Sequence, residues 1–206
     1  MGNRILSVEK TTDNRFLNMY NLHYENRVGH KRLYHLASRG KDIKDLKLNT
    51  RKNTPDGVII YSIYGEKHDH MVLVRQYRLA IDDYIYELPA GLVDAGETYA
   101  EAGTRELKEE TGLDFEPLQV DEMYHKPFYT TIGMTDESCA TVYGYATGTV
   151  SREGLEENEQ LEVVLADRTE IRRILKEENV SMNCGYLMMH FLHHTEEDPF
   201  YFVRQK

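Results

Sequence analysis

The sequence of 206 residues has little of what secreted, membrane-spanning or nucleic-acid-binding proteins need. Its two cysteines, Cys139 and Cys184, predict reduced thiols in a cytoplasmic protein, with a disulfide between them as the alternative. No apolar run is long enough to span a membrane, and we expect no secretory signal at the start. Acidic residues outnumber basic ones by 35 to 25, and the net charge of -10 disfavours nucleic acid as a partner. These absences favour a cytoplasmic protein, and the negative charge does not argue against a small anionic ligand, because metal ions can supply local positive charge.

Hydrophobic residues make up 40% of the chain, enough for one core with a small appended element. Residues 1–50 alternate apolar and polar side chains on both sides of Gly29, which predicts an antiparallel hairpin. A hairpin of this size cannot bury its apolar face alone, so we expect it to pack against the remaining chain or a second subunit. The charged residues 41–56 are interpreted as a linker from this element to a main domain at 51–206.

The main domain alternates predicted strands with predicted helices, and it contains no internal repeat. The last helix would place Cys184, Met188 and Phe191 on one apolar face. Helices that cover both faces of a mixed sheet form an α/β/α sandwich, which is the fold class that we predict. Strands are expected at 57–65, 70–78, 84–89, 120–130, 139–150 and 161–166, and helices at about 98–111, 168–178 and 182–195.

The most informative segment is residues 91–113, which read GLVDAGETYAEAGTRELKEETGL. Carboxylates this close together repel one another unless cations lie among them. Hard divalent ions such as Mg²⁺ prefer oxygen ligands and commonly bridge to phosphate groups. The segment therefore indicates a magnesium site for a phosphate-bearing substrate, with a solvated acidic helix face as the alternative. The charged residues concerned are Glu97, Arg105, Glu106, Glu109 and Glu110.

The local pattern places most of these carboxylates on one helix. Thr98 followed by Glu101 is a capping box, and Gly112 is the residue type that follows a helix end. Glu109 and Glu110 oppose the helix dipole near its C-terminal end, which indicates function rather than stability. With Glu106 they fall within one arc about 100° wide. The neighbouring arc, which we expect to pack on the sheet, holds Ala100, Gly103, Leu107 and Thr111.

The spacing of the whole segment resembles the Nudix box. Gly91, five residues, Glu97, seven residues and the run at 105–113 agree with its fixed positions. The resemblance implies a Nudix fold and a hydrolase that cleaves a nucleoside diphosphate linked to another group, using a divalent metal and water. It also implies that Glu106 and Glu110 are the main metal ligands. The expected ion is Mg²⁺, with Mn²⁺ as the alternative.

The remaining positions of the box would support these ligands. Arg105 would orient the glutamates through salt bridges, a role that suits its planar fork of donors. Glu109 would assist catalysis as a further or outer ligand, and Glu97 would join the same network. Gly91 would lie where the loop bends close to the metal, and Gly112 would be a structural residue at the helix end.

Residues before the box resemble the ADP-ribose pyrophosphatase branch of this family. VRQYR at 74–78 and ELPAG at 87–91 stand where members of that branch commonly carry Q-x-R and E-L-P-A-G. In that branch the carbonyl of the alanine before the glycine binds metal, which implies the same role for Ala90. The resemblance further implies ADP-ribose as substrate and AMP and ribose 5-phosphate as products.

Two arginines and one glutamate near the box are candidate substrate-binding residues. Arg78 and Glu87 match positions that are tied to substrate in relatives, and Arg75 would add charge near the phosphates. A diphosphate carries charges that arginine can pair with two hydrogen bonds at once. The alternative is that both arginines belong to a solvated strand edge.

The catalytic base is expected outside the box, because the attacking water must lose a proton to a group within reach. Residues 154–164, GLEENEQLEVV, resemble the acidic loop that supplies it in ADP-ribose pyrophosphatases. Carried over, Glu157 would be the base and Glu159 an extra metal ligand. Glu156 lies beside them, and either it or Glu159 is an alternative base. A plain acidic loop without a catalytic role is the other alternative.

One segment departs from the pattern of that branch. Residues 131–137 read TIGMTDE, where the branch usually has S-P-G-x-[ST]-D-E. Gly133 fits and is a candidate substrate-binding residue, but Ile132 replaces the proline that is associated with ADP-ribose. The alternative substrates are therefore another nucleotide sugar or a dinucleotide coenzyme. An alternative of another class is a non-hydrolytic ADP-ribose sensor, which the intact box and the acidic charge disfavour.

The N-terminal hairpin also bears on assembly. ADP-ribose pyrophosphatases that resemble this chain are dimers, and their N-terminal strands exchange between subunits to help form the adenosine pocket. The resemblance implies a homodimer with the hairpin of residues 1–50 as its interface.

Overall fold

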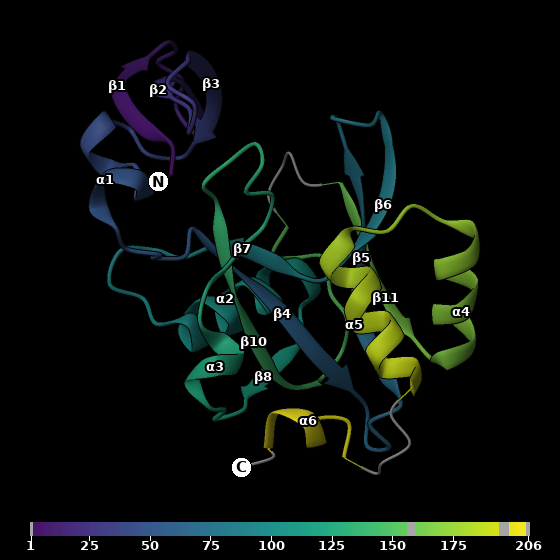
Figure 1. Ribbon diagram of the computed structural model, residues 1–206. Coiled ribbons are helices and arrows are strands. Elements are labelled where there is room, and N and C mark those ends of the chain that lie inside the picture. Colours follow the sequence, from purple (N-terminus) through teal and green to yellow (C-terminus); the bar gives the residue numbers. More distant parts are fainter. Residues whose placement is uncertain (1, 156–159, 194–197, 205–206) are drawn as a thin grey trace. The chain divides into compact units, whose positions relative to one another are not determined.

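The computed structural model describes residues 2–155, 160–193 and 198–204, and its contacts divide the chain into two compact units (Figure 1). The N-terminal unit consists of Met1–Asp56 and Pro127–Cys139, and the main unit consists of Gly57–Lys126 and Ala140–Lys206. The first unit thus takes a segment from the middle of the chain. The division of the sequence into domains at 1–50 and 51–206 stays a prediction.

The N-terminal unit is built on an antiparallel sheet in the order β1-β2-β3. The hairpin predicted around Gly29 is present as β2 and β3, and Gly29 has the positive φ of 83° that its turn requires. Leu46, in the segment interpreted as a linker, is fully buried against the sheet with Tyr20 and Leu36. The elements are β1 (Arg4–Lys10), β2 (Asn18–Glu25), β3 (Lys31–Ser38), the 3-10 helix η1 (Ile43–Asp45), α1 (Lys47–Thr50) and β9 (Phe128–Tyr129).

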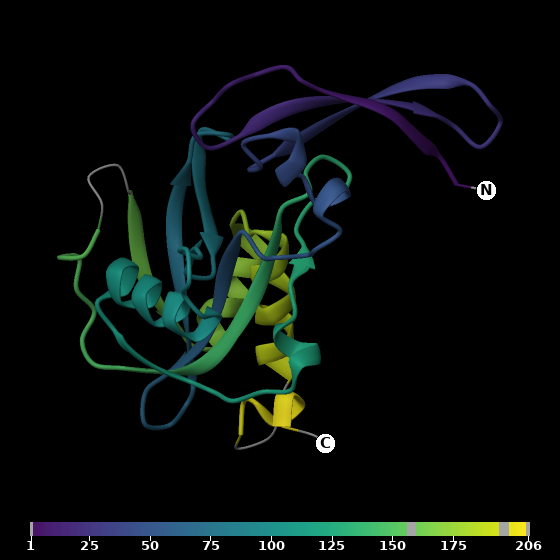
Figure 2. The same cartoon turned by 90° about the vertical axis from the view of Figure 1, so that its left-hand side faces the viewer.

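The main unit is built on a sheet in the order β11-β5-β4-β10-β8, with β6 paired to β5 and β7 paired to β4. Helices cover it on both sides, and in both views α2 and α5 lie on opposite sides of the strands (Figure 1, Figure 2). The strands are β4 (Gly57–Tyr64), β5 (His70–Arg78), β6 (Asp83–Glu87), β7 (Ala90–Leu92), β8 (Asp114–Pro117), β10 (Ser138–Thr147) and β11 (Leu161–Ala166). The helices are α2 (Tyr99–Thr111), α3 (Glu122–His125), α4 (Arg168–Glu177), α5 (Met182–His193) and α6 (Tyr201–Arg204).

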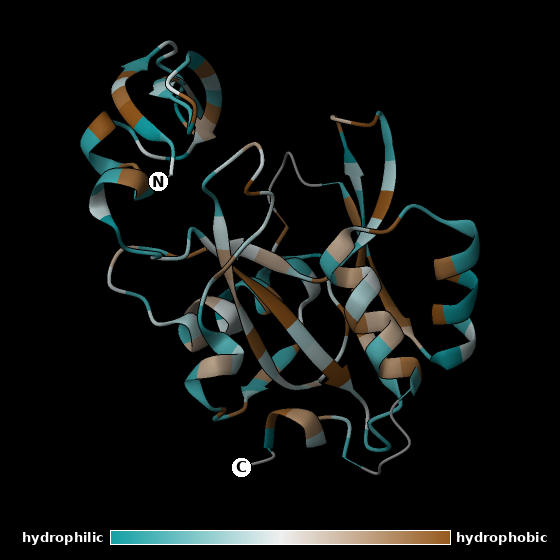
Figure 3. Cartoon of the chain, in the orientation of Figure 1, coloured by the Kyte–Doolittle hydropathy of each residue, from teal (hydrophilic) through white to brown (hydrophobic). Residues whose placement is uncertain are grey.

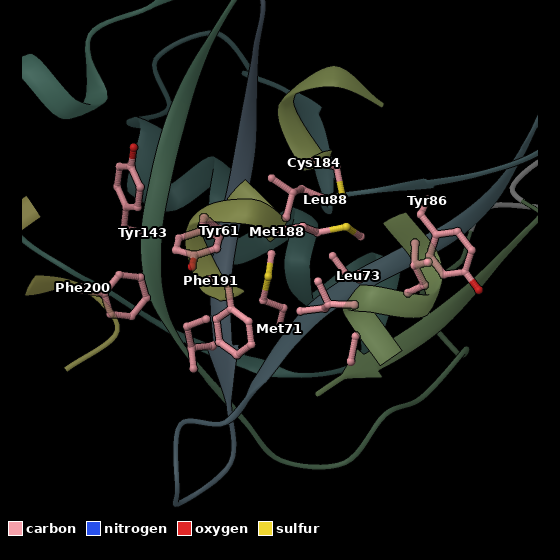
Figure 4. Close-up of a cluster of buried hydrophobic side chains, with 14 of the residues drawn as sticks. Tyr61, Met71, Leu73, Tyr86, Leu88, Tyr143, Cys184, Met188, Phe191 and Phe200 are labelled. Carbon is pink, nitrogen blue, oxygen red and sulfur yellow. The ribbon is translucent and has the colours of Figure 1, made fainter. Parts of the chain in front are cut away.

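The alternation of side chains along β4 explains the two layers. Ile60 packs with Leu107 of α2, whereas Tyr61 and Ile63 pack with the cluster that contains Phe191 of α5. Successive side chains of a strand point to opposite faces, so a strand that is mostly apolar on both faces supplies both cores. Figure 3 shows this hydrophobic colouring along β4, and Figure 4 shows the cluster on the α5 side. The predicted fold class, an α/β/α sandwich with a mixed sheet and a small antiparallel sheet, is confirmed.

The strand predicted at 120–130 is wrong. This segment forms α3 and the two-residue strand β9 instead. The carboxylate of Asp121 accepts a hydrogen bond from the Met123 N–H and caps α3, and Pro127 follows two residues after the helix ends, where a helix cannot continue. Among the described residues, no helix is both long and apolar enough to cross a membrane.

Candidate active site

Helix α2 begins and ends as the sequence predicts. The Thr98 hydroxyl accepts from the Glu101 N–H at 3.3 Å, and the Glu101 carboxylate accepts from the Thr98 N–H at 2.8 Å, which completes the capping box. Gly112 ends the helix with a φ of 74°, a left-handed conformation that glycine adopts without strain. These two termini fix which residues of the helix face the sheet and which face away from it.

The face of α2 that packs on the sheet contains Gly103, Leu107 and Thr111, all of which are buried as expected. Ala102 is also fully buried, whereas the predicted Ala100 is only partly buried, so the contact face is rotated slightly at its start. A Cβ on Gly103 would lie 3.3 Å from Val142, which indicates close packing of this helix on β10. In the second half of the helix, Glu106 and Glu110 approach β7.

Arg105 is the centre of a hydrogen-bond network on this side of α2. Its Nε and Nη2 donate to the two oxygens of Glu97, each at 3.0 Å. Its Nη1 donates to Glu106 at 2.7 Å and to Glu109 at 3.1 Å, and Nη2 also donates to the Leu92 carbonyl at 3.0 Å. All five N–H groups of the guanidinium are therefore used. A lysine could not hold this many acceptors in one plane.

The network changes the acid–base properties of its members. Hydrogen bonds from Arg105 lower the pKa of Glu97, because they stabilise the charged carboxylate. The pKa of Arg105 is raised, first by its hydrogen bonds to Glu97 and also by Glu106. Both groups are consequently charged at neutral pH, and one guanidinium offsets part of the charge of three carboxylates.

The backbone of β7 passes unusually close to α2. A Cβ built on Gly91 would lie 1.9 Å from the carboxyl carbon of Glu106, so a side chain at this position would displace that carboxylate. The N–H of the neighbouring Ala90 donates to Glu110 at 3.2 Å, and Glu110 is only 5% exposed. The glycine therefore allows two glutamates and the Ala90 backbone to meet on one side of the sheet.

These residues border a cavity of about 520 Å³. Its lining carboxylates and carbonyls supply oxygen atoms, which are the ligands that Mg²⁺ and Mn²⁺ prefer. The Glu106 carboxylate fills the space beside the Gly91 backbone. The residues present therefore fit a divalent ion. Within the part of the chain that the structure describes, no three acidic, histidine or cysteine side chains are already gathered around one point. The cavity is lined by Ala90, Gly91, Leu92, Asp94, Arg105, Glu106, Glu109, Glu110 and Gly154.

The predicted base and extra ligand cannot be placed beside this cavity. Glu157 and Glu159, and their neighbour Glu156, lie outside the described residues. The lining nevertheless includes residues that the sequence interpretation missed, namely the Leu92 carbonyl, Asp94 and Gly154. Gly154 opens the acidic stretch GLEENEQ, and a glycine at that point was the available sequence signal.

The two candidate arginines of β5 lie on opposite faces of the sheet. Val72 packs on the α2 side and Leu73 on the α5 side, so alternation puts Arg78 on the α2 side and Arg75 on the α5 side. The contacts agree, because the guanidinium of Arg75 stacks on Tyr84 at 4.0 Å from its ring centroid. On the other side, Arg78 Nε donates to Glu87 at 2.6 Å.

The candidate Gly133 belongs to the N-terminal unit. Its carbonyl accepts a hydrogen bond from the Tyr34 hydroxyl at 2.6 Å. Nearby in the sequence, Glu137 accepts from Arg39 at 2.7 Å, and Ile132, which replaces the family's proline, is 60% exposed. The loop is thus held by residues of the N-terminal segment.

Comparisons with known proteins agree with this geometry. The model of the NUDIX domain family matches residues 53–182. The chain is 34% identical over 109 residues to an ADP-ribose pyrophosphatase of Saccharomyces cerevisiae, which is 51% of this chain and 43% of that protein. It is 31% identical over 109 residues to the ADP compounds hydrolase NudE of Escherichia coli, which is 53% of this chain and 50% of that protein.

A crystal structure of an ADP compounds hydrolase has the same fold. It superposes with a TM-score of 0.60 at 21% sequence identity and covers 86% of this chain and 84% of its own. The chain spans about half the length of the curated relatives that it matches.

Proposed function

This chain belongs to the Nudix family, and from that premise we propose that it is a metal-dependent pyrophosphohydrolase of nucleoside diphosphate derivatives. The proposed substrate is ADP-ribose, which water would cleave to AMP and ribose 5-phosphate. The observation that carries the proposal is the cavity in which Glu106, Glu109 and Glu110 face the backbone of Ala90 and Gly91. The names of the yeast and bacterial relatives support the choice of an ADP derivative.

The residues proposed to hold the metal are Glu106, Glu110, the carbonyl of Ala90, and Glu159. The bound metal, proposed to be Mg²⁺, would offset the charge of the diphosphate and lower the pKa of a bound water. Arg105 would keep Glu106 in place, because it holds this carboxylate at 2.7 Å. Glu109, which also accepts a hydrogen bond from Arg105, would assist catalysis as a further or outer metal ligand.

Hydrolysis then requires a base and an oriented substrate. Glu157 is proposed to take the proton as the water oxygen bonds to one phosphorus and the bond from that phosphorus to the bridging oxygen breaks. Arg78 is proposed to bind the diphosphate, since it lies on the α2 side of the sheet and Glu87 orients its fork. Arg75, stacked on Tyr84 on the opposite face, stays the weaker candidate for substrate binding. Gly133 stays a candidate for substrate binding.

Assembly as a homodimer is also proposed, with the N-terminal sheet as the interface. The sheet supports this proposal because large apolar side chains of β1 and β3, such as Ile5 and Leu33, are 44% and 46% exposed. Burying such residues against a second copy would remove apolar surface from water. The cytoplasmic location predicted from the sequence stays a prediction.

The test is release of AMP or other phosphate-containing products from a panel of compounds with Mg²⁺. The panel contains ADP-ribose, ADP-glucose, GDP-mannose, NADH, FAD and diadenosine polyphosphates. Preferred turnover of ADP-ribose is expected. Preferred turnover of another member would keep the mechanism and change the substrate. The panel is wide because Ile132, which replaces the proline associated with ADP-ribose, is exposed. Tight binding of ADP-ribose without hydrolysis of any member would contradict the enzyme and favour the sensor.

A further inference from the structure

Residues Ser151 to Gly154 pack on the C-terminal end of α2. The Ser151 N–H donates to the Thr111 carbonyl at 2.9 Å, and this bond satisfies a carbonyl that the helix end leaves without a helical partner. A Cβ on Gly112 would lie 2.6 Å from the Ser151 backbone nitrogen. The segment therefore lies against the helix that carries the glutamates, and no side chain separates the two backbones at this point.

Gly154 makes a second close contact with the same helix. A Cβ built on it would lie 2.7 Å from the carbonyl oxygen of Glu109 and 3.0 Å from its Cα. The backbone of Gly154 is not in the left-handed region, unlike that of Gly112 and Gly148. Backbone conformation therefore does not require a glycine here. What excludes a side chain is the close approach to Glu109.

This contact borders two cavities. Glu109 and Gly154 line the carboxylate cavity of about 520 Å³ and also a second cavity of about 370 Å³, which is bordered by Lys108. The first cavity is also lined by Glu106 and Glu110, the proposed metal ligands.

We propose that Gly154 is a positioning residue, which closes the carboxylate cavity by holding the loop against Glu109. The proposal rests on the hydrolase function proposed above. The Cβ of an alanine at 154 would lie 2.7 Å from the Glu109 carbonyl oxygen, whereas ordinary contact needs about 3.4 Å. The two backbones would therefore have to move apart by about 0.7 Å. The loop would move rather than α2, because Gly154 is exposed whereas α2 is fixed by its capping box and buried face.

A displacement of this size matters for catalysis. Catalytic groups must be held within about 0.5 Å of the productive geometry, and a misplacement of about 1 Å can cost about 100-fold in rate. Glu106 and Glu110 stay on α2 when the loop moves, whereas Glu159, the further ligand proposed above, follows Gly154 in the sequence. A loss of turnover that exceeds the loss of metal binding is therefore the expected signature of Gly154.

The experiment compares Gly154→Ala with Gly185→Ala in the full chain. Gly185 is a matched control within α5, since a Cβ there would meet only Val180 at 3.7 Å, an ordinary contact. Five quantities are measured for both variants and the wild type: kcat, KM, binding of Mn²⁺ by electron paramagnetic resonance, melting temperature, and hydrogen exchange of the Ser151 amide.

Gly154→Ala should lower kcat at least about tenfold with a smaller change in KM, weaken Mn²⁺ binding by a smaller factor than it lowers kcat, and speed exchange at Ser151. Gly185→Ala should match the wild type in kcat, KM, Mn²⁺ binding and exchange, with an equal or slightly higher melting temperature because alanine is favoured over glycine within a helix. Wild-type kcat and unchanged exchange in Gly154→Ala would overturn the proposal, and so would a parallel loss of Mn²⁺ binding and melting temperature. If the wild type hydrolyses nothing, the proposed function fails, and unchanged exchange at Ser151 then separately refutes the backbone contact.

Discussion

Two helices of the main unit each carry an arginine surrounded by glutamates, and only one of them borders the candidate site. On α4, Arg173 bonds to both oxygens of Glu170, at 3.0 and 2.8 Å, and to Glu178 at 2.6 Å. On α2, Arg105 holds Glu97, Glu106 and Glu109 in a similar way. The two arginines are also similarly exposed, at 37% and 31%. An arginine with several glutamates therefore does not by itself identify a site.

What distinguishes α2 is the approach of a second backbone. Gly91 lets β7 reach the Glu106 carboxylate, and Glu110 is nearly buried beneath it. The glutamates around Arg173 are 31% to 54% exposed and lie at the surface. Desolvated carboxylates that are brought together are costly unless a cation accompanies them, whereas exposed ones are screened by water. The comparison teaches that burial and backbone approach, not charge composition, mark the site.

The largest expected effect comes from removing one carboxylate on each helix. Glu110→Gln should lower kcat by about 100-fold or more, because it removes a proposed ligand, and even partners of ligands contribute about 10- to 100-fold. Glu177→Gln on α4 is the matched control and should keep the wild-type rate. The measurement is AMP release from ADP-ribose at saturating Mg²⁺. A Glu110→Gln enzyme within threefold of wild type would show that the metal assignment is wrong.

The arginines themselves give the next largest difference. Arg105→Lys keeps the charge but cannot bond Glu97, Glu106, Glu109 and the Leu92 carbonyl together, so we expect kcat to fall about tenfold or more. Arg173→Lys should leave kcat unchanged. Steady-state kinetics of the two variants checks this, with circular dichroism to confirm that both are folded. Equal rates for the two lysine variants would remove the distinction between the helices.

A smaller effect is expected from the two faces of β5. Arg78→Ala should raise KM for ADP-ribose about tenfold, because it removes a charged hydrogen bond that is worth about 1.5 kcal/mol or more. Arg75→Ala, on the opposite face, should leave KM within twofold. Initial rates over a range of substrate concentrations measure both. A larger KM change in Arg75→Ala than in Arg78→Ala would reverse the assignment.

The smallest effect is the dependence of stability on pH. The networks of Arg105 and Arg173 should show the same dependence. Hydrogen bonds from their arginines lower the pKa of Glu97 and of Glu170 below the ordinary value of 4.5. A lowered pKa in the folded state stabilises the protein above pH 4.5, and this contribution disappears as the pH falls through the folded pKa. Melting temperatures of Arg105→Lys and Arg173→Lys should thus approach the wild-type value as the pH falls below 4.5 and through the lowered pKa of these glutamates. A difference that grows in acid would contradict the linkage.

The sequence predicted those features that depend on local rules. The capping box at Thr98, the left-handed Gly112 and the apolar run of β4 each follow from residues near one another in the chain. The face of Arg75 could not be predicted, because it depends on which helix covers each side of β5, and this follows only from tertiary packing. The strand expected at 120–130 failed because the Asp121 cap and Pro127 outweighed its apolar alternation.

Residues of the site divide in the same way. The glutamates on α2 and the glycine of β7 were predictable because their spacing in the sequence carries the pattern. Gly154 was not, because its contact with Glu109 joins segments that are 45 residues apart and depends on the path of a loop. The Leu92 carbonyl was not predictable either, because any residue supplies a carbonyl and only its position near Arg105 makes it a partner.

Anomalous diffraction from crystals of the protein soaked in Mn²⁺ would locate the bound metal itself. An anomalous peak is expected in the cavity between α2 and β7, with oxygens of Glu106, Glu110 and the Ala90 carbonyl at about 2.1 Å, as expected for an ion of this kind. Peaks at the glutamates around Arg173, or elsewhere on the surface and not in that cavity, would contradict the proposed metal site.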